Sequence, residues 1–253
     1  MLYTIYMWAV IAGFTLACGG AVLLLIPIDR KYRFYERIAR FWANAIVRAS
    51  GVKVTRSGFE KLDPATPYIF MSNHQSYFDV ICLIAFLTPR LRFVAKKELV
   101  YLPVFGQAMW ATGHIIVNRS RHEQAVSELR KAALKIRAGA SLLVFMEGTR
   151  SPDHKLGAFK KGGFMLALEA KAPIVPVSIA GTRPLMPKGG FSFTKSDVTI
   201  TIGDPIPVEG MTENDRQGLM DQTRAAIIRH FPSDSAEFRA NQEDPVLPTP
   251  QPD

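Results

Sequence analysis

A histidine and an aspartate stand five positions apart in NHQSYFD, positions 73–79, which follows one apolar run and precedes another. If a helix begins at Ser76 or Tyr77, Asp79 lies in its first turn, where its carboxylate can reach the His74 imidazole. A carboxylate on one imidazole nitrogen fixes the tautomer and stabilises the imidazolium, so the other nitrogen can take a proton from a hydroxyl. The pair is therefore a candidate general base with its orienting partner. By itself, so short a motif more often caps a helix than catalyses a reaction.

A second motif, FMEGTRS at positions 145–151, places an acid and an arginine on a loop directly after an apolar strand pattern. Loops at the carboxyl ends of strands are where α/β sheets bind ligands. Gly148 lets the backbone approach a ligand closely, and the planar guanidinium of Arg150 is suited to phosphate. The alternative interpretation is a local ion pair between Glu147 and Arg150 that holds the turn.

Two further segments have the same strand character. GHIIVNR at positions 113–119 predicts a strand that ends on Arg119, and APIVPV at positions 172–177 predicts a buried apolar strand bracketed by prolines. The remaining histidines have no patterned partner, so we expect structural or surface roles for His114, His122, His154 and His230.

Short β-rich runs alternate with helical patterns from about residue 51 onward. Strands are predicted at 68–71, 92–95, 114–117, 142–145, 174–178 and 198–202, and amphipathic helices at 121–137 and 212–230. This alternation predicts an α/β fold, with one catalytic domain over residues 51–232 built on a mixed β-sheet flanked by helices. Residues 233–253 are rich in Pro, Asp and Gln and are predicted to be disordered.

The first 28 residues carry no charged side chain, and a helix that spans a bilayer needs about 20 apolar residues. Residues 1–50 are therefore predicted to form N-terminal membrane helices ahead of the domain. No positive stretch precedes the apolar run, which argues against a cleaved signal peptide. The helix-loosening residues Gly13, Gly19, Gly20 and Pro27 leave open whether the run spans the bilayer or forms a half-inserted hairpin.

A basic cluster follows the apolar run and consists of Arg30, Lys31, Arg33, Arg37 and Arg40. The positive-inside rule places this cluster, and with it the rest of the chain, on the cytoplasmic side of the membrane. Apolar residues recur at helical spacing through positions 30–48. That stripe fits equally well a helix in the membrane interface and a helix packed on the domain behind it.

The overall charge favours polyanionic partners. The chain of 253 residues has a formal net charge of +9 and a pI of about 9.7, which suits nucleic acid, anionic lipid or a phosphorylated substrate. Its two cysteines, Cys18 and Cys82, lie far apart in apolar runs, which argues against a disulfide framework or a zinc site. The absence of G-x-S-x-G, P-loop and dinucleotide fingerprints argues against those enzyme classes.

The four segments occur in the order found in glycerolipid acyltransferases, and the chain resembles that family, in particular its bacterial 1-acyl-glycerol-3-phosphate acyltransferases. NHQSYFD, GHIIVNR, FMEGTRS and APIVPV carry the resemblance, which covers about residues 51–203. A single HX4D motif would be weak evidence, whereas four ordered blocks are specific. One departure is Met146, where the family usually has proline, and it bears on the rigidity of the loop.

The resemblance implies residue roles and a reaction. The implied catalytic residues are His74 as general base and Asp79 as its partner. Arg119 and Arg150 would bind the acceptor phosphate, and Glu147, Gly148 and Thr149 would shape the acceptor pocket. The implied reaction moves a fatty acyl chain from acyl-CoA or acyl carrier protein to the sn-2 hydroxyl of 1-acyl-glycerol-3-phosphate, giving phosphatidic acid for phospholipid synthesis. It requires no metal and no further cofactor.

The implied partners are lysophosphatidate, the acyl donor and anionic membrane lipids, and not nucleic acid. The implied location is the bacterial inner membrane, with the domain on the cytoplasmic face. Two other hypotheses remain. One is acylation of another lysolipid, such as lyso-ornithine lipid or a lysophospholipid with a larger headgroup. The other is a non-enzymatic basic membrane adaptor, which would leave His74, Asp79 and Glu147 unexplained.

Overall fold

The computed structural model describes residues 1–29, 33–88, 90–117, 122–151 and 155–231. Its strands are β1 (Val54–Ser57), β2 (Ile69–Ser72), β3 (Leu91–Lys96), β4 (Ile115–Val117), β5 (Ser141–Phe145), β6 (Ile174–Ala180) and β7 (Val198–Ile202). Within these ranges they form one seven-stranded sheet in the order β1-β7-β6-β2-β5-β3-β4. All neighbours are parallel except β6 and β7, which are antiparallel, so the predicted mixed sheet is confirmed.

Each strand predicted from the sequence is present, with ends that shift by two residues at most. The central strands β2 and β6 are buried along their whole length, as expected for strands covered on both faces. β1 is missing from the prediction because only Val54 is partly buried and its other residues are exposed. An edge strand of this kind has no apolar alternation to reveal it.

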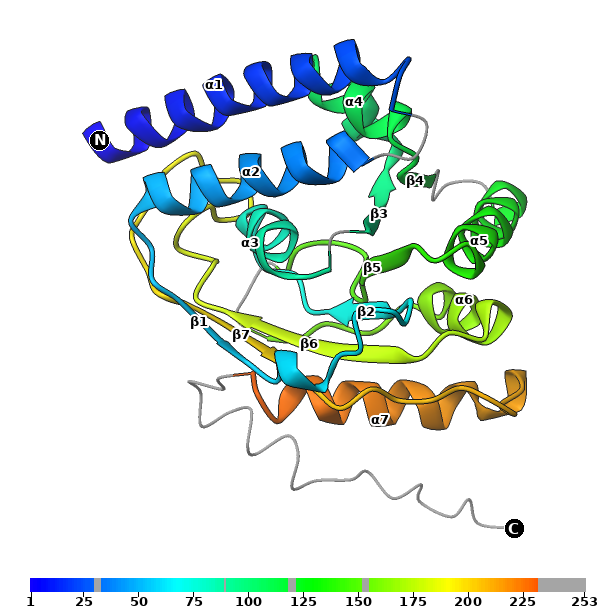
Figure 1. Ribbon diagram of the computed structural model, residues 1–253. Coiled ribbons are helices and arrows are strands. Elements are labelled where there is room, and N and C mark those ends of the chain that lie inside the picture. Colours follow the sequence, from blue (N-terminus) through cyan, green and yellow to red (C-terminus); the bar gives the residue numbers. More distant parts are fainter. Residues whose placement is uncertain (30–32, 89, 118–121, 152–154, 232–253) are drawn as a thin grey trace.

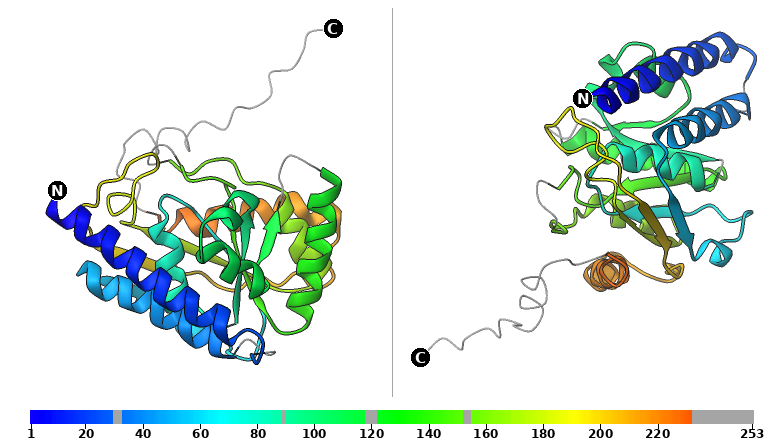
Figure 2. Two further views of the ribbon diagram at one scale, coloured as in Figure 1. Left: turned by 90° about the horizontal axis from the view of Figure 1, so that it is seen from above. Right: turned by 90° about the vertical axis from the view of Figure 1, so that its left-hand side faces the viewer.

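Helices cover both faces of the sheet (Figures 1 and 2). One face carries α1 (Leu2–Leu25), α2 (Arg33–Ser50) and α3 (Phe78–Phe86), with the short α4 (Phe105–Ala111) beside α1. The other face carries α5 (His122–Arg137), α6 (Gly162–Ala170) and α7 (Arg216–Ile228). Each face has its own buried apolar cluster, one joining α2 and α3 to the sheet and one joining α5, α6 and α7 to it. This arrangement confirms the α/β fold class.

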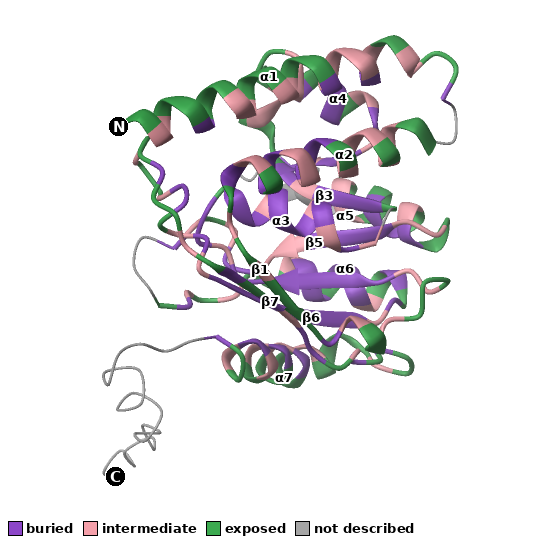
Figure 3. Cartoon of the chain, turned by 60° about the vertical axis from the view of Figure 1, so that its left-hand side comes forward, coloured by how far each residue is buried: buried purple, intermediate pink, exposed green. Residues whose placement is uncertain are grey.

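Among the described helices, α1 is the one whose length and composition would allow it to cross a membrane. Only 11% of its apolar window is buried inside the protein, where Met7, Cys18 and Val22 pack inward (Figure 3). The remaining apolar surface is too large to be common on a protein that meets only water. This exposure indicates that the protein associates with a membrane.

The predicted helix at 30–48 corresponds to α2, although residues 30–32 lie outside the described part of the chain. The Asp29 carboxylate accepts the N–H groups of residues 33–35 at 2.8 to 2.9 Å and caps the helix. The apolar stripe of α2 is buried in the same cluster as α3 and the sheet, through Trp42, Ala43, Ile46 and Val47. The stripe therefore packs on the domain, which decides between the two interpretations left open above.

The predicted division between residues 50 and 51 thus separates segments that share one core. At the other end of the chain, the predicted helix at 212–230 is present as α7, preceded by a short 3-10 turn at Glu213–Asp215. The tail predicted to be disordered, residues 233–253, lies outside the described residues.

Candidate active site

The two loops with candidate chemistry leave the sheet side by side. β2 and β5 are parallel neighbours, and their register pairs Ser72 with Phe145. His74 and Glu147 therefore each stand two residues beyond the last paired position. The Met146 N–H extends the pairing by donating to the Ser72 carbonyl at 3.0 Å. This register brings two motifs that are 73 residues apart to the same edge of the sheet.

The His74 imidazole and the Asp79 carboxylate form the predicted pair. Nδ1 of His74 lies 2.8 Å from Oδ2 of Asp79, and α3 begins at Phe78, which puts the aspartate in the first helical turn. Oδ2 also accepts the N–H groups of Gln75 at 2.7 Å and Ser76 at 2.9 Å. Asp79 is fully buried, whereas the His74 side chain is 12% exposed. Because Oδ2 serves as the acceptor of these two N–H groups, we assign the ring proton to Nδ1, which leaves Nε2 as an acceptor.

Two further contacts hold His74 in place. Its ring stacks on the Phe145 ring, with 3.8 Å between centroids and 16° between planes. Its carbonyl accepts the Ser151 N–H at 2.8 Å. The strand that leads into the second motif thus also supplies the wall against which the His74 imidazole rests. Sequence patterns predict Phe145 only as a strand residue.

Glu147 joins two loops through its carboxylate. Oε1 accepts the His74 N–H at 3.0 Å, and Oε2 accepts the Gly157 N–H at 2.9 Å. The residue is buried, and burial raises the pKa of its carboxyl group while the two N–H bonds oppose that rise. The Arg150 guanidinium lies over the Tyr77 ring instead. The alternative hypothesis of a local Glu147–Arg150 ion pair is therefore wrong.

Met146 stands where proline would be usual in the family that the sequence resembles. Its side chain is 1% exposed and belongs to the apolar cluster under α6. Its N–H donates to the Ser72 carbonyl, and its carbonyl accepts the Lys160 N–H at 2.8 Å. Proline has no N–H and could not make the first bond. Backbone bonds and a buried side chain therefore hold this loop in place of a proline ring.

The rest of the loop turns toward solvent. Gly148 has a φ of +71°, in the left-handed region that favours glycine, and its N–H donates at 3.1 Å to the carbonyl of the last β5 residue. Thr149 is exposed. The Arg150 Cζ lies 3.7 Å from the centroid of the Tyr77 ring, and the Arg150 carbonyl accepts the Lys188 ammonium at 2.7 Å. The second predicted block, GHIIVNR, ends outside the described residues, at Arg119.

Several contacts around His74 come from residues that no sequence pattern singled out for this role. The Asn73 side chain bonds both backbone groups of Ile179 on β6. Its Nδ2 donates to the Ile179 carbonyl at 2.8 Å, and its Oδ1 accepts the Ile179 N–H at 2.9 Å. Tyr77 lies inside the first motif, and an aromatic residue there was the available signal for its contact with Arg150. Lys188 belongs to the long loop after β6 and carried no signal.

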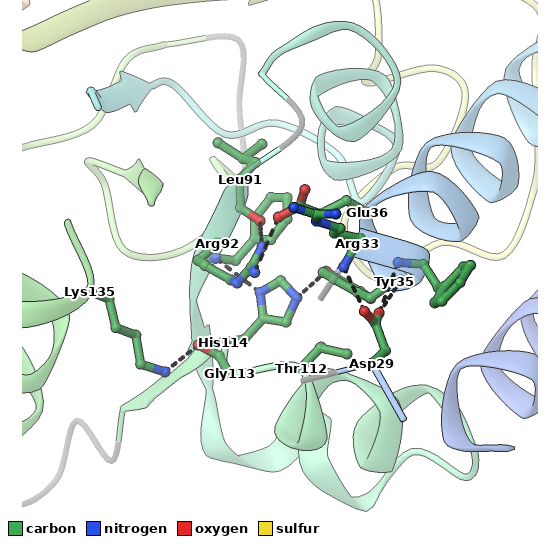
Figure 4. A network of polar contacts seen from close by, with 12 residues as sticks. Asp29, Arg33, Tyr35, Glu36, Leu91, Arg92, Thr112, Gly113, His114 and Lys135 are labelled. Atoms are coloured by element: carbon green, nitrogen blue, oxygen red, sulfur yellow. Dashed lines mark hydrogen bonds and ion pairs between the residues drawn. The ribbon is translucent and has the colours of Figure 1, made fainter. Parts of the chain in front are cut away.

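A second histidine, His114, is buried between α2 and the sheet (Figure 4). Its Nδ1 accepts the Phe93 N–H at 3.0 Å, and its Nε2 faces the Tyr35 hydroxyl. Burial, together with the cations of Arg92 and Lys135, lowers the pKa of His114 to about 3. The imidazole is therefore neutral, which fits the structural role expected for it.

An arginine accompanies this second histidine as well. Arg92 is buried, its Cζ lies 5.2 Å from the centroid of the Tyr35 ring, and its Nη2 lies 3.5 Å from Oε1 of Glu36 (Figure 4). Burial raises the pKa of Tyr35 to about 12, so the phenol keeps its proton. The cluster ties α2 to β3 and β4 by polar contacts beneath the N-terminal helices.

The His74 centre can remove a proton from a hydroxyl, and in the described part of the chain neither Cys82 nor Ser76 is available as a nucleophile. Cys82 is fully buried, and burial raises the pKa of its thiol. The Ser76 hydroxyl donates to the Met186 carbonyl at 2.9 Å and is engaged there. Nε2 of His74 can accept a proton, and Arg150 offers a cation on the neighbouring loop. This chemistry suits direct transfer to a hydroxyl substrate that carries an anionic group.

Residues 53–180 match the acyltransferase family. The chain belongs to this family. It is 31% identical over 217 residues to a 1-acyl-sn-glycerol-3-phosphate acyltransferase of Chlamydomonas reinhardtii, covering 83% of this chain and 64% of the algal protein. It is 32% identical over 190 residues to the human 1-acyl-sn-glycerol-3-phosphate acyltransferase alpha, covering 75% of this chain and 67% of the human protein. The chain thus spans about two thirds of the length of these relatives.

A solved structure extends the likeness of this acyltransferase along nearly the whole chain. The crystal structure of the 1-acyl-sn-glycerophosphate acyltransferase PlsC from Thermotoga maritima superposes with a TM-score of 0.79 at 27% identity. The match covers 94% of this chain and 95% of that one. The shared architecture therefore includes helices outside the family match at 53–180.

Proposed function

We propose that this protein acylates the sn-2 hydroxyl of 1-acyl-glycerol-3-phosphate and so makes phosphatidic acid for phospholipid synthesis. The observation that carries the proposal is the 2.8 Å bond between Nδ1 of His74 and Asp79, which leaves Nε2 as the proton acceptor. Membership of the acyltransferase family and relatives named for this reaction support it. The acyl donor is a thioester, either acyl-CoA or acyl carrier protein.

The transfer is direct. Nε2 of His74 removes the proton from the acceptor hydroxyl while its oxygen forms a bond to the thioester carbonyl carbon. The carboxylate of Asp79 stabilises the resulting imidazolium. The tetrahedral intermediate then collapses by breaking the C–S bond, and the leaving thiolate takes the proton back from His74. The products are phosphatidic acid and the free thiol, and no metal or redox group enters the balance.

The developing oxyanion needs hydrogen-bond donors that are not already engaged. The Gly148 N–H donates to the end of β5, and the Ser151 N–H donates to His74. Between them, the N–H groups of Thr149 and Arg150 donate to no protein atom within the described ranges. We assign these two amides as the oxyanion donors on the Glu147 loop.

The acceptor phosphate is assigned to Arg150, together with Arg119, which lies outside the described residues. In the described part of the chain, the Arg150 guanidinium is paired with no carboxylate and rests on the face of the Tyr77 ring. A planar guanidinium in this state can still form a forked pair with phosphate oxygens. Glu147 and Gly148 act on the acceptor indirectly, because they shape the loop that carries Arg150 and the base.

The lipid substrates explain the exposed apolar surface of α1. We place the protein on the inner membrane of a bacterium, with α1 in contact with lipid and the domain on the cytoplasmic face. The basic residues Arg33, Arg37 and Arg40 at the start of α2 support this orientation. Each would add about 1 kcal/mol of attraction to anionic headgroups near the surface.

The deciding experiment is an acylation assay with purified, detergent-solubilised full-length protein and radiolabelled acyl-CoA or acyl carrier protein. The acceptors are lysophosphatidate, monoacylglycerol, lyso-ornithine lipid and lysophosphatidylcholine. We expect lysophosphatidate to be used at least tenfold faster than monoacylglycerol and lyso-ornithine lipid, which lack phosphate, because a charged bond to phosphate contributes about 1.5 to 3 kcal/mol. Equal use of monoacylglycerol would refute phosphate recognition. If another lysolipid were preferred, that lysolipid would be the acceptor. If none of the four acceptors were used, the result would favour the adaptor hypothesis.

A further inference from the structure

The C-terminal helix α7 lies against β6, on the face of the sheet opposite α1, α2 and α3 (Figure 2). It also lies beyond the residues that match the acyltransferase family. From this helix the half-buried Arg224 reaches the loop that follows the Glu147 motif. Its Nη1 donates to the Gly157 carbonyl at 2.8 Å, and its Nη2 donates to the Leu156 carbonyl at 3.2 Å. Its Cζ also lies 5.2 Å from the centroid of the Phe159 ring.

The peptide group between Leu156 and Gly157 connects this arginine to the base. Its carbonyl accepts from Arg224, and its N–H donates to Oε2 of Glu147 at 2.9 Å. The other carboxylate oxygen, Oε1, accepts the N–H of His74 at 3.0 Å. One unbroken chain of hydrogen bonds therefore runs from α7 through a peptide group and a buried carboxylate to the backbone of the base. Donation from Arg224 to the Leu156 carbonyl polarises the peptide group and strengthens the bond from the Gly157 N–H to Glu147.

We propose that Arg224 is a positioning residue for His74, acting through Leu156, Gly157 and Glu147. The activity readout of this inference rests on the function proposed above. Arg224 touches no reacting atom in this scheme, because two of its guanidinium nitrogens are engaged by carbonyls. Its effect is to fix the Glu147 carboxylate, which fixes the backbone position of the base. A misplacement of about 1 Å can lower turnover by about 100-fold.

Gly157 offers a way to disturb the same chain at its middle. A Cβ added at Gly157 would meet Oε2 of Glu147 at 2.9 Å, so the carboxylate would have to move. At Gly162, on the first turn of α6, an added Cβ meets nothing within 4 Å. Gly157→Ala therefore displaces the link between α7 and His74, and Gly162→Ala is its matched control.

The first experiment measures kcat and KM for lysophosphatidate in Arg224→Ala, Arg224→Lys and Arg229→Ala. Arg229 is an exposed arginine at the end of the same helix and serves as the control. We expect Arg224→Ala to lower kcat about 10- to 100-fold with KM for lysophosphatidate changed less than about threefold. Arg224→Lys should recover part of kcat, because an ammonium can still reach one carbonyl. Equal kcat in Arg224→Ala and Arg229→Ala would overturn the proposal, and so would a rise in KM alone.

A double-mutant cycle tests whether the substitutions at Arg224 and Gly157 lower kcat through the same contacts or independently. If Arg224 acts through Gly157, the loss of kcat in Arg224→Ala/Gly157→Ala should be clearly smaller than the product of the two single losses. Gly162→Ala should instead combine multiplicatively with Arg224→Ala. Multiplicative losses in both cycles would overturn the proposed route.

Amide hydrogen exchange tests the same chain without any substrate. In Arg224→Ala, peptides covering residues 72–76 and 155–160 should exchange faster than in the wild type and in Arg229→Ala, because the bonds to Glu147 hold both segments. Unchanged exchange at 72–76 would overturn the proposal even if stability fell. If the wild type did not acylate lysophosphatidate but Arg224→Ala still loosened residues 72–76, the proposed function would fail and the positioning role would stand.

Discussion

Two of the five histidines, His74 and His114, differ in what faces their Nδ1 nitrogen. At His74 the buried carboxylate of Asp79 lies 2.8 Å from Nδ1, so this nitrogen donates a hydrogen bond and Nε2 is left as an acceptor. At His114 the Phe93 N–H donates to Nδ1 at 3.0 Å, and this bond would be lost if that nitrogen took up a proton. Burial and neighbouring cations act in the same direction and lower the pKa of His114 to about 3.

Each histidine also has an arginine that lies over a tyrosine ring. Arg150 lies 3.7 Å from the Tyr77 centroid near the protein surface, and Arg92 lies 5.2 Å from the Tyr35 centroid inside. The buried arginine has the carboxylate of Glu36 as its partner. At the other site the carboxylate, that of Asp79, pairs with His74 and not with the arginine. The same residue types thus make one site that we propose exchanges a proton and binds an anion, and another whose histidine is buried and neutral.

The largest effect should come from removing either member of the His74–Asp79 pair. His74→Ala and Asp79→Asn should each lower kcat by about 10²- to 10⁴-fold, because that is the usual contribution of a general base. Circular dichroism and detergent-solubilised yield should stay close to wild type. Near-normal turnover in both variants would refute the assignment of the base.

Arg150→Ala should have the next largest effect, and it should depend on the acceptor. We expect kcat/KM for lysophosphatidate to fall tenfold or more, since a charged bond to phosphate contributes about 1.5 to 3 kcal/mol. The rate with monoacylglycerol should change little, and Arg229→Ala should change neither. Equal losses on both acceptors would mean that Arg150 acts on the loop rather than on phosphate.

His114→Leu should change stability rather than catalysis. Removing the imidazole leaves the buried Phe93 N–H without an acceptor, which costs about 1 to 3 kcal/mol of unfolding free energy at neutral pH. The kcat per folded molecule should remain within about twofold of wild type, as expected for a residue that makes no contact in the transition state. Chemical denaturation measures the free energy of unfolding, and a rate normalised to the folded fraction measures kcat. A large fall in normalised kcat would mean that His114, like His74, contributes to catalysis.

The acid sensitivity of the wild type should depend on the same residue. The folded pKa of His114, about 3, lies below the ordinary value of 6.5. Between these pH values His114 binds a proton in the unfolded chain but not in the folded one. The free energy of unfolding therefore falls as pH falls, by up to about 1.4 kcal/mol per pH unit. Above about pH 7 this contribution should be constant. Denaturation series at pH 7 and pH 5 should show a smaller loss in His114→Leu, and an equal loss would show that the buried ring is protonated.

The smallest effect should come from substituting Tyr77, whose ring lies against the Arg150 guanidinium. Tyr77→Leu should raise KM for lysophosphatidate two- to fivefold, because an exposed cation–π contact contributes about 0.5 to 1 kcal/mol. Tyr77→Phe keeps the ring face and is the control, with KM unchanged. A similar rise in both variants would assign the effect to the hydroxyl group instead.

The parts of the site that short-range geometry dictates could be predicted from the sequence. His74 and Asp79 meet because a helix begins between them, and residues five apart across a helix start have few other arrangements. The central strands were predictable because they are apolar throughout. β1 was not, because three exposed residues give it no pattern and its pairing with β7 crosses more than half of the chain.

Sequence alone thus determined the α/β class and the proximity of His74 to Asp79, and it led to the proposal that Arg150 binds phosphate. The tertiary structure decided which long-range partners these residues have. The parallel register of β2 and β5 brings the Glu147 carboxylate to the His74 N–H, and α7 brings Arg224 to the loop beyond it. A carboxylate or guanidinium can satisfy its hydrogen bonds with any nearby backbone group. Only strand register and helix packing, which depend on the whole core, select the group that lies within reach.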